Sequence, residues 1–171
     1  MPRLLVHVEG QTEEVFVNEV LRRHLLGVGY ESVSARIVGN ARLRQRRGGI
    51  RPWPSVRKDI IRHLRADAGC LATTMVDYYG LPRVGDGAWP GRVRASGLPT
   101  DQKAKHVETA LAEDISAIAG DSLNTLRFIP FVIMHEYEGL LFSDCAAFAR
   151  GIGRADLTPR FAEIRLAFAT P

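Results

Sequence analysis

The sequence contains only two cysteines, Cys70 and Cys145, and their spacing fits neither a zinc site nor a redox pair. We therefore expect two reduced, buried thiols and exclude a disulfide framework. No apolar run approaches the roughly 20 residues that span a bilayer. The N-terminus also lacks the successive charged, apolar and small-residue zones of a signal peptide. These absences predict a cytoplasmic protein with no membrane segment.

Acidic residues are missing from one basic stretch of the chain. From Arg36 to Lys58 there are eight basic residues and no acidic one, although the net charge of the whole chain is only +4. Clustered arginines around Gly48 and Gly49 are suited to holding phosphates through paired hydrogen bonds. We predict that this loop binds nucleic acid, and a solvated loop is the alternative. The predicted binding residues are Arg42, Arg44, Arg46, Arg47 and Arg51.

Apolar periodicity predicts one α/β domain over residues 1–171. We expect a central, mostly parallel four-stranded sheet flanked by helices, because strands and helices alternate along the chain. The predicted strands are residues 3–8, 32–38, 70–76 and 127–134. The predicted helices are 12–26 with Thr12 as N-cap, 55–66, 101–118 and 138–149, with a weaker amphipathic stretch at 160–168. Residues 78–99 are rich in glycine and proline and predict a long loop that is either functional or disordered.

Carboxylates follow three of the predicted strands. Glu9 follows the first strand, Asp77 the third, and Glu136 and Glu138 the fourth, where their spacing puts them on one side of an extended chain. The carboxyl ends of parallel strands are where α/β proteins place their chemistry. Oxygen ligands of this kind suit Mg²⁺ or Mn²⁺, and Glu13 is a further candidate. The sequence therefore predicts a divalent-cation site at this edge of the sheet.

Several of the candidates also have a structural explanation, although Glu9 does not. Glu13 suits the first turn of a helix, and Gly10 suits a sharp turn that constrains the backbone. Asp77 could cap the following loop, and His135 could be a hydrogen-bonded structural residue instead of a proton carrier. Lys103 could stabilise a transition state, as could its neighbours Lys105 and His106, or all three could be solvated. Four aromatic residues could stack on bases or pack against the sheet: Trp53, Tyr78, Tyr79 and Trp89.

Several segments, in order, resemble the DUF4276 family over nearly the entire chain. They are Val8-Glu9-Gly10-Gln11-Thr12-Glu13-Glu14, Val76-Asp77-Tyr78-Tyr79-Gly80-Leu81-Pro82, Pro90-Gly91, Arg127-Phe128-Ile129-Pro130 and His135-Glu136-Tyr137-Glu138-Gly139-Leu140-Leu141-Phe142. This bacterial family in turn resembles the Toprim domains of OLD-family nucleases. The resemblance implies a Toprim-like fold, and it leads us to expect that a C-terminal piece is missing.

The Toprim resemblance implies roles for individual residues. Glu9 would be a metal ligand or general base, Glu13 would bind a second metal, and Asp77 matches the first aspartate of an Asp-x-Asp motif. Tyr79 replaces the second aspartate of that motif, which leaves the number of metals open. Glu136 and Glu138 would complete the second site.

The resemblance further implies an Mg²⁺- or Mn²⁺-dependent nuclease that works with an AAA- or ABC-type ATPase in anti-phage defence or in a mobile element. DNA is favoured over RNA as the substrate. A degenerate domain that binds nucleic acid or a partner without cutting is the first alternative, and Tyr79 favours it. A small-molecule phosphatase or phosphotransferase is disfavoured, because the arginine-rich loop is larger than one phosphate requires.

Overall fold

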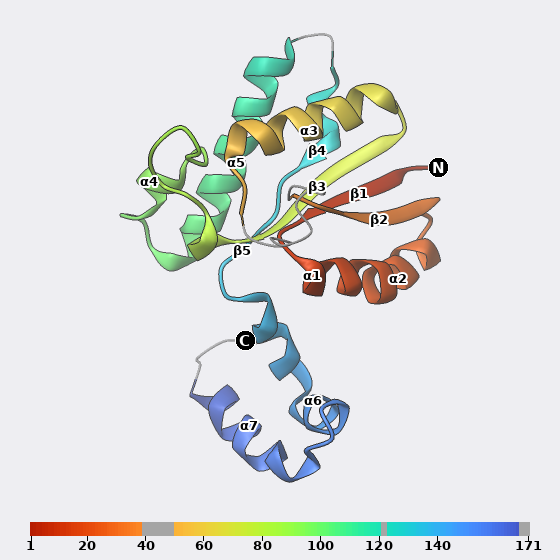
Figure 1. The fold of residues 1–171 in the computed structure, drawn as a ribbon, viewed down its shortest axis with the longest axis vertical. Coiled ribbons are helices and arrows are strands. Elements are labelled where there is room, and N and C mark those ends of the chain that lie inside the picture. The colour runs from red at the N-terminus through yellow and green to blue at the C-terminus, as the bar shows by residue number, and fades with distance from the viewer. Residues whose placement is uncertain (39–49, 121–122, 168–171) are drawn as a thin grey trace. The chain divides into compact units, whose positions relative to one another are not determined.

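The computed structural model describes residues 1–38, 50–120 and 123–167 (Figure 1). The chain divides into two compact units, Met1–Met134 and His135–Pro171. Among the described residues, no helix is both long and apolar enough to cross a membrane.

A parallel sheet forms the centre of the first unit. Its strands are β1 (Arg3–Val8), β2 (Ser32–Ile37), β3 (Cys70–Asp77), β4 (Phe128–Ile129) and β5 (Val132–Ile133). The strand order is β2-β1-β3-β4, β5 also pairs with β3, and every pairing is parallel. The α/β class and the mostly parallel sheet are therefore confirmed, and the first three strands match their predicted ranges to within one residue.

The predicted fourth strand is wrong as a single element, because β4 and β5 are separated by Pro130 and Phe131. Proline has no N–H with which to continue a ladder of hydrogen bonds. Thr74, in the middle of β3 and fully buried, replaces the interrupted ladder. Its hydroxyl donates to the carbonyl oxygen of Phe131 at 2.8 Å and accepts from the Phe131 N–H at 3.0 Å.

Replacing Thr74 with valine should therefore lower the free energy of unfolding of this unit by roughly 2 kcal/mol, because two backbone groups of Phe131 lose their partner. Urea unfolding followed by tryptophan fluorescence measures this change, since both tryptophans are buried in the first unit. Thr109→Val is the matched control: its hydroxyl is exposed and bonds only to the Lys105 carbonyl within its own helix. Equal losses in the two variants would contradict the role assigned to Thr74.

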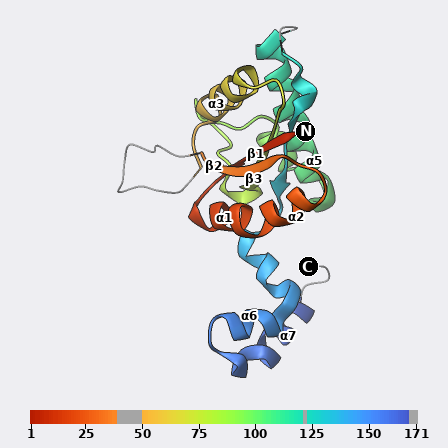
Figure 2. The same ribbon diagram turned by 90° about the vertical axis from the view of Figure 1, so that its right-hand side faces the viewer.

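One face of the sheet is covered by the helical segment α1 (Gln11–Phe16), η1 (Val17–Leu21) and α2 (Arg22–Gly27) (Figure 2). Two details of the predicted helix are wrong. Gly10, and not Thr12, is the N-cap, and η1 is a π-helical turn. A π turn holds more residues than an α turn, so positions assigned with a uniform period of 3.6 no longer share one face. Val17 is buried, whereas Val15 and Val20 are exposed.

The opposite face carries α3 (Trp53–Ala66) and α5 (Thr100–Ala119), which share one apolar core with β3 (Figure 1). Asp114 of α5 ties the two helices together. Its carboxylate accepts from Trp53 Nε1 at 2.7 Å and pairs with Arg57 at 2.9 Å. The inward face of α5 ends at the buried Ala119, whereas Ile118, the last residue of the predicted helix 101–118, is exposed.

The segment after β3 is a packed element and not the open loop that its composition predicts. It contains the short helices η2 (Tyr78–Gly80) and α4 (Arg92–Ala95). Leu81 and Trp89 are buried, and Trp89 Nε1 donates to the carbonyl oxygen of Arg51 at 2.9 Å. The apolar side chains of this segment belong to the same core as those of α3 and α5. This burial explains how a segment rich in glycine and proline can be ordered.

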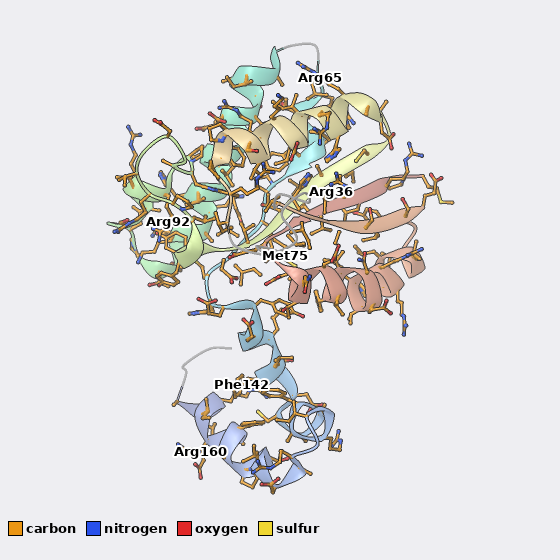
Figure 3. All side chains as sticks on the ribbon, in the orientation of Figure 1. Arg36, Arg65, Met75, Arg92, Phe142 and Arg160 are labelled. Carbon is orange, nitrogen blue, oxygen red and sulfur yellow. The ribbon has the colours of Figure 1, made fainter. Side chains whose placement is uncertain are left out.

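The second unit is helical, with η5 (Tyr137–Asp144), α6 (Cys145–Gly151), η6 (Ala155–Leu157) and α7 (Thr158–Leu166). The helix predicted over 138–149 is therefore a 3₁₀ helix followed by a short α-helix. Phe148 stacks on Phe161 with ring centroids 4.7 Å apart, and Phe142 packs edge-on against both (Figure 3). Cys145 of this unit and Cys70 of the first are buried free thiols, as predicted.

Candidate functional site

The carboxyl ends of β1 and β3 lie side by side in the first unit. The two strands are parallel neighbours, and their register pairs Val8 with Met75. Glu9 is the first residue after β1, and Asp77 is the last residue of β3. Neighbouring strands are about 4.8 Å apart, so both acids belong to the same edge of the sheet.

The carboxylate of Glu9 packs against the turn that follows Asp77. A Cβ atom added to Gly80 would lie 3.5 Å from Glu9 Oε2 and 3.8 Å from Oε1. Oε2 is sealed from solvent. These distances are ordinary van der Waals contacts, so they place the turn at Gly80 against the Glu9 carboxylate without requiring glycine there. The structure brings Glu9 and the end of β3 together, as the strand-end argument predicted.

Glu13 has a structural role at the start of α1. It is only 8% exposed, and its Oε2 accepts a hydrogen bond from the Gly10 N–H at 3.0 Å. Gly10 has an ordinary extended backbone, with φ −139°. The predicted conformational requirement for glycine at this position is therefore wrong. A Cβ at Gly10 would lie 3.1 Å from Glu13 Oε2, a tight contact that a small shift of the Glu13 side chain would relieve. The ligand role of Glu13 stays a prediction.

His135, Glu136 and Glu138 open the second unit, and all three are exposed. Their expected extended geometry is wrong, because Glu136 is the N-cap of η5 and Glu138 lies in its first turn. In a 3₁₀ helix, residues two apart do not face the same side. Whether these residues join Glu9 and Asp77 stays a prediction.

The described part of the chain contains no group of three or more His, Cys, Asp or Glu side chains arranged to hold a metal ion. Mg²⁺ is commonly bound through one or two carboxylates together with water and substrate phosphates. Glu9 and Asp77 therefore fit a weakly held Mg²⁺ or Mn²⁺ ion better than a preformed cage. Lys103 is half-buried near the start of α5, and its catalytic role stays a prediction.

Four of the predicted nucleic-acid-binding residues lie outside the described residues: Arg42, Arg44, Arg46 and Arg47. Arg51 is described, and its Nη1 lies 3.6 Å from a carboxylate oxygen of Asp59. Of the four aromatic candidates, Trp53, Tyr78 and Trp89 are buried and pack in the core. Tyr79 is 59% exposed and remains able to stack on a base.

Two features escaped the sequence analysis. The first is a pair of histidines, His7 on β1 and His63 on α3, whose facing nitrogens are 3.3 Å apart. His7 is fully buried, and burial lowers the pKa of His7 to about 4. Burial, together with nearby Arg62 and Arg36, also lowers the pKa of His63. The sequence signal that could have revealed this pair is the single histidine within the apolar strand 3–8.

The second feature is Arg92, which is only 5% exposed. Its Nε donates to the carbonyl oxygen of Tyr78 at 2.9 Å, and its guanidinium carbon lies 3.8 Å from the centroid of the Tyr78 ring. Nothing in the glycine- and proline-rich sequence around Arg92 marks it as different from Arg83 or Arg94. Only the path of the folded chain brings it to the end of β3.

Residues 8–171 match the family model described as "Domain of unknown function (DUF4276)". The searches of curated proteins and of solved structures found no match. The likeness to Toprim domains therefore stays a prediction. Because the family match extends from the end of β1 to the last residue, the chain belongs to the DUF4276 family.

Proposed function

We propose that this protein is a metal-dependent nuclease with a Toprim-like fold, and that Glu9 and Asp77 form the centre of its active site. One observation carries the proposal. The Glu9 carboxylate lies against the turn directly after Asp77, where a Cβ atom added to Gly80 would be 3.5 Å from Glu9 Oε2. This contact is at the carboxyl edge of two parallel strands, β1 and β3. This edge is where α/β enzymes bind their substrates.

In this proposal Glu9 and Asp77 hold Mg²⁺ or Mn²⁺. The cation supplies positive charge to offset the charge that develops on the scissile phosphate. The turn at Gly80 lies against the Glu9 carboxylate, whose Oε2 is sealed from solvent. Glu13 supports the site indirectly, because its bond to the Gly10 N–H fixes the chain just after Glu9. Glu136 and Glu138 remain candidates for a second cation, and His135 and Lys103 for proton transfer and charge stabilisation.

The basic segment and Tyr79 support nucleic acid as the substrate class. Eight basic residues without an acid between Arg36 and Lys58 give a phosphate-binding composition, and Tyr79 presents an exposed ring beside Asp77. DNA remains favoured over RNA. An AAA- or ABC-type ATPase partner and a role in anti-phage defence or a mobile element follow from the resemblance to OLD-family nucleases. Cytoplasmic location also belongs to this proposal.

A binding module that does not cut is the second candidate. One observation favours it: Tyr79 stands where the second motif aspartate is expected. Such a module would keep the basic segment and lose the cations.

The experiment that tests the proposal is cleavage of supercoiled plasmid and of short RNA, with Mg²⁺, with Mn²⁺ and with a chelator. We expect cation-dependent cleavage that falls about 100-fold or more in Glu9→Gln and in Asp77→Asn, since even indirect supports of a metal site are typically worth 10–100-fold. Asp86→Asn is the matched control, because Asp86 is an exposed acid in the same segment after β3.

Equal cleavage by the wild type and both variants would assign the activity to a contaminant and contradict the proposal. Retained binding of nucleic acid without cleavage, in every cation, would instead support the binding module. Adding an ATPase of the AAA or ABC type to that inactive preparation then decides whether a partner is required.

A further inference from the structure

Arg92 is a nearly buried cation with no anionic partner in the described structure. It is 5% exposed, and none of residues 1–38, 50–120 and 123–167 offers it a carboxylate. Its neighbours are the carbonyl oxygen and the ring of Tyr78, neither of which carries a net charge. Burial of a charged group is costly unless it is paired, so an anion bound to Arg92 would be favourable.

The donors of Arg92 are only partly used. Nε is bonded to Tyr78, whereas Nη1 and Nη2 have no hydrogen-bond partner among the described residues. Solvent reaches both terminal nitrogens of Arg92. Neither belongs to the buried side-chain atoms that lack a hydrogen-bond partner in the described part of the chain. A guanidinium with both Nη groups unused presents the paired N–H geometry that matches a phosphate or carboxylate.

The backbone holds Arg92 in place. Gly91 adopts φ +75°, and a Cβ there would lie 2.8 Å from the Ala110 Cβ of α5. The chain therefore passes against α5 immediately before Arg92, at a point where only glycine fits. On its other side, Arg92 is tied to Tyr78, the residue that follows Asp77. Figure 3 labels Arg92 in the part of the first unit that carries α4.

We propose that Arg92 is a phosphate-binding residue: its Nη1 and Nη2 groups hold oxygens of a phosphate at the carboxyl end of β3. The same short turn, Tyr78–Gly80, contacts Arg92 at its first residue and Glu9 at its last. A phosphate on Arg92 would thus be held at the first residue of the turn whose last residue lies against Glu9. That the phosphate belongs to a nucleic acid rests on the proposed function, whereas the binding of a phosphate anion does not.

Titration with pyrophosphate, followed by calorimetry in the presence of chelator, tests this inference without any cleavage reaction. We expect wild-type binding to weaken about tenfold or more in Arg92→Gln, because the paired charge-assisted bonds are lost. Arg92→Lys keeps the charge but not the two-nitrogen geometry, and it should bind with intermediate affinity. Arg94→Gln, an exposed arginine in the same helix, is the matched control and should bind as the wild type does.

Asp77→Asn separates this inference from the proposed function. With chelator present, this variant should bind pyrophosphate as well as the wild type or better, because a nearby negative charge is removed. Plasmid cleavage, in contrast, should be lost. Absence of cleavage in every protein, together with Arg92-dependent binding, would overturn the nuclease and leave the phosphate site standing.

Undiminished pyrophosphate binding in both Arg92→Gln and Arg92→Lys would overturn the phosphate site, and so would no binding by the wild type. Fluorescence of the buried Trp53 and Trp89 checks that each variant is folded. If Arg92→Gln does not fold, Arg92→Lys decides the question, because an ammonium can still lie over the Tyr78 ring.

Discussion

Acidification from pH 7 to pH 4 should remove about 3 kcal/mol of folding stability through His7 alone. His7 is fully buried between the sheet and α3, and burial lowers its pKa to about 4 from an ordinary value of 6.5. The charges of His63 and Arg36 lower the pKa further, whereas the bond to Thr73 and the charge of Asp59 oppose the shift. The neutral imidazole is therefore the folded form.

The hydrogen bonds of His7 define its tautomer. Nδ1 lies 3.2 Å from the carbonyl oxygen of Thr73, which can only accept, so Nδ1 carries the hydrogen. Nε2 of the neutral ring is then an acceptor, and the Nδ1–H of His63, 3.3 Å away, donates to it. Protonation of His7 would put an N–H on Nε2, so the bond would persist only with His63 in its other tautomer, with Nδ1 as the acceptor.

The direction of the pH effect follows from which state binds the proton more tightly. The folded pKa of about 4 lies below the unfolded value of 6.5, so the unfolded chain takes up the proton first. The stabilisation is complete above pH 6.5 and is lost as the pH falls toward 4. His63, whose pKa is also lowered, contributes in the same direction.

Urea unfolding at a series of pH values, with chelator present and with tryptophan fluorescence as the signal, measures the loss. In His7→Gln the fall in stability between pH 7 and pH 4 should be smaller by about 3 kcal/mol. His24→Gln removes an exposed histidine from α2 and should leave the wild-type pH profile unchanged. A His7→Gln profile parallel to that of the wild type would show that His7 does not titrate as its burial requires.

Replacing Arg127 with methionine should cost roughly 2–4 kcal/mol of stability, because three charge-assisted hydrogen bonds are lost together. Arg127 ends the short helix η4 (Thr125–Arg127) just before β4. Its Nη1 donates to the carbonyl oxygens of Asp67 at 2.8 Å and Cys70 at 3.0 Å, and its Nη2 donates to that of Leu64 at 2.8 Å. These carbonyls belong to the end of α3, the turn after it and the start of β3.

The geometry of Arg127 suits its position. The C-terminal end of a helix carries partial negative charge and unpaired carbonyls, both of which a cation satisfies. Arg127→Lys should recover only part of the lost stability. An ammonium lacks the planar fork with which the guanidinium reaches carbonyls on both sides of the turn.

The shift of the urea midpoint measures the stability lost in Arg127→Met when the m-value is the same as in the wild type. Arg65→Met is the matched control, since Arg65 lies exposed in the last turn of α3, and its loss should stay within about 0.5 kcal/mol. A cost for Arg127→Met no larger than that of Arg65→Met would contradict this assignment.

Local patterns in the sequence were sufficient for most of the sheet. The strand over residues 3–8 and the one from Cys70 were predicted to within a residue, because a buried parallel strand is an apolar run bounded by turn residues. Pro130 was visible in the sequence, but its effect on the fourth strand depends on Thr74, which is 56 residues away and supplies the missing bonds.

The helix after Glu9 illustrates a different limit. The apolar pattern predicted a helix at the correct place, but it could not reveal the π turn at Val17–Leu21, which moves the buried face away from Val15 and Val20. The segment after β3 is a similar case. Glycine and proline predict the absence of long helices, but not whether the chain packs into a core or lies open to solvent.

The sequence by itself determined the α/β class, the order of the elements and the family, because these depend on local periodicity and on motifs read along the chain. It also placed Glu9 and Asp77 at strand ends. Only the tertiary structure decided that the turn at Gly80 lies against Glu9, that His7 faces His63, and that Arg92 reaches Tyr78. The physical reason is that burial and pairing of polar groups depend on contacts between distant segments, which no local pattern encodes.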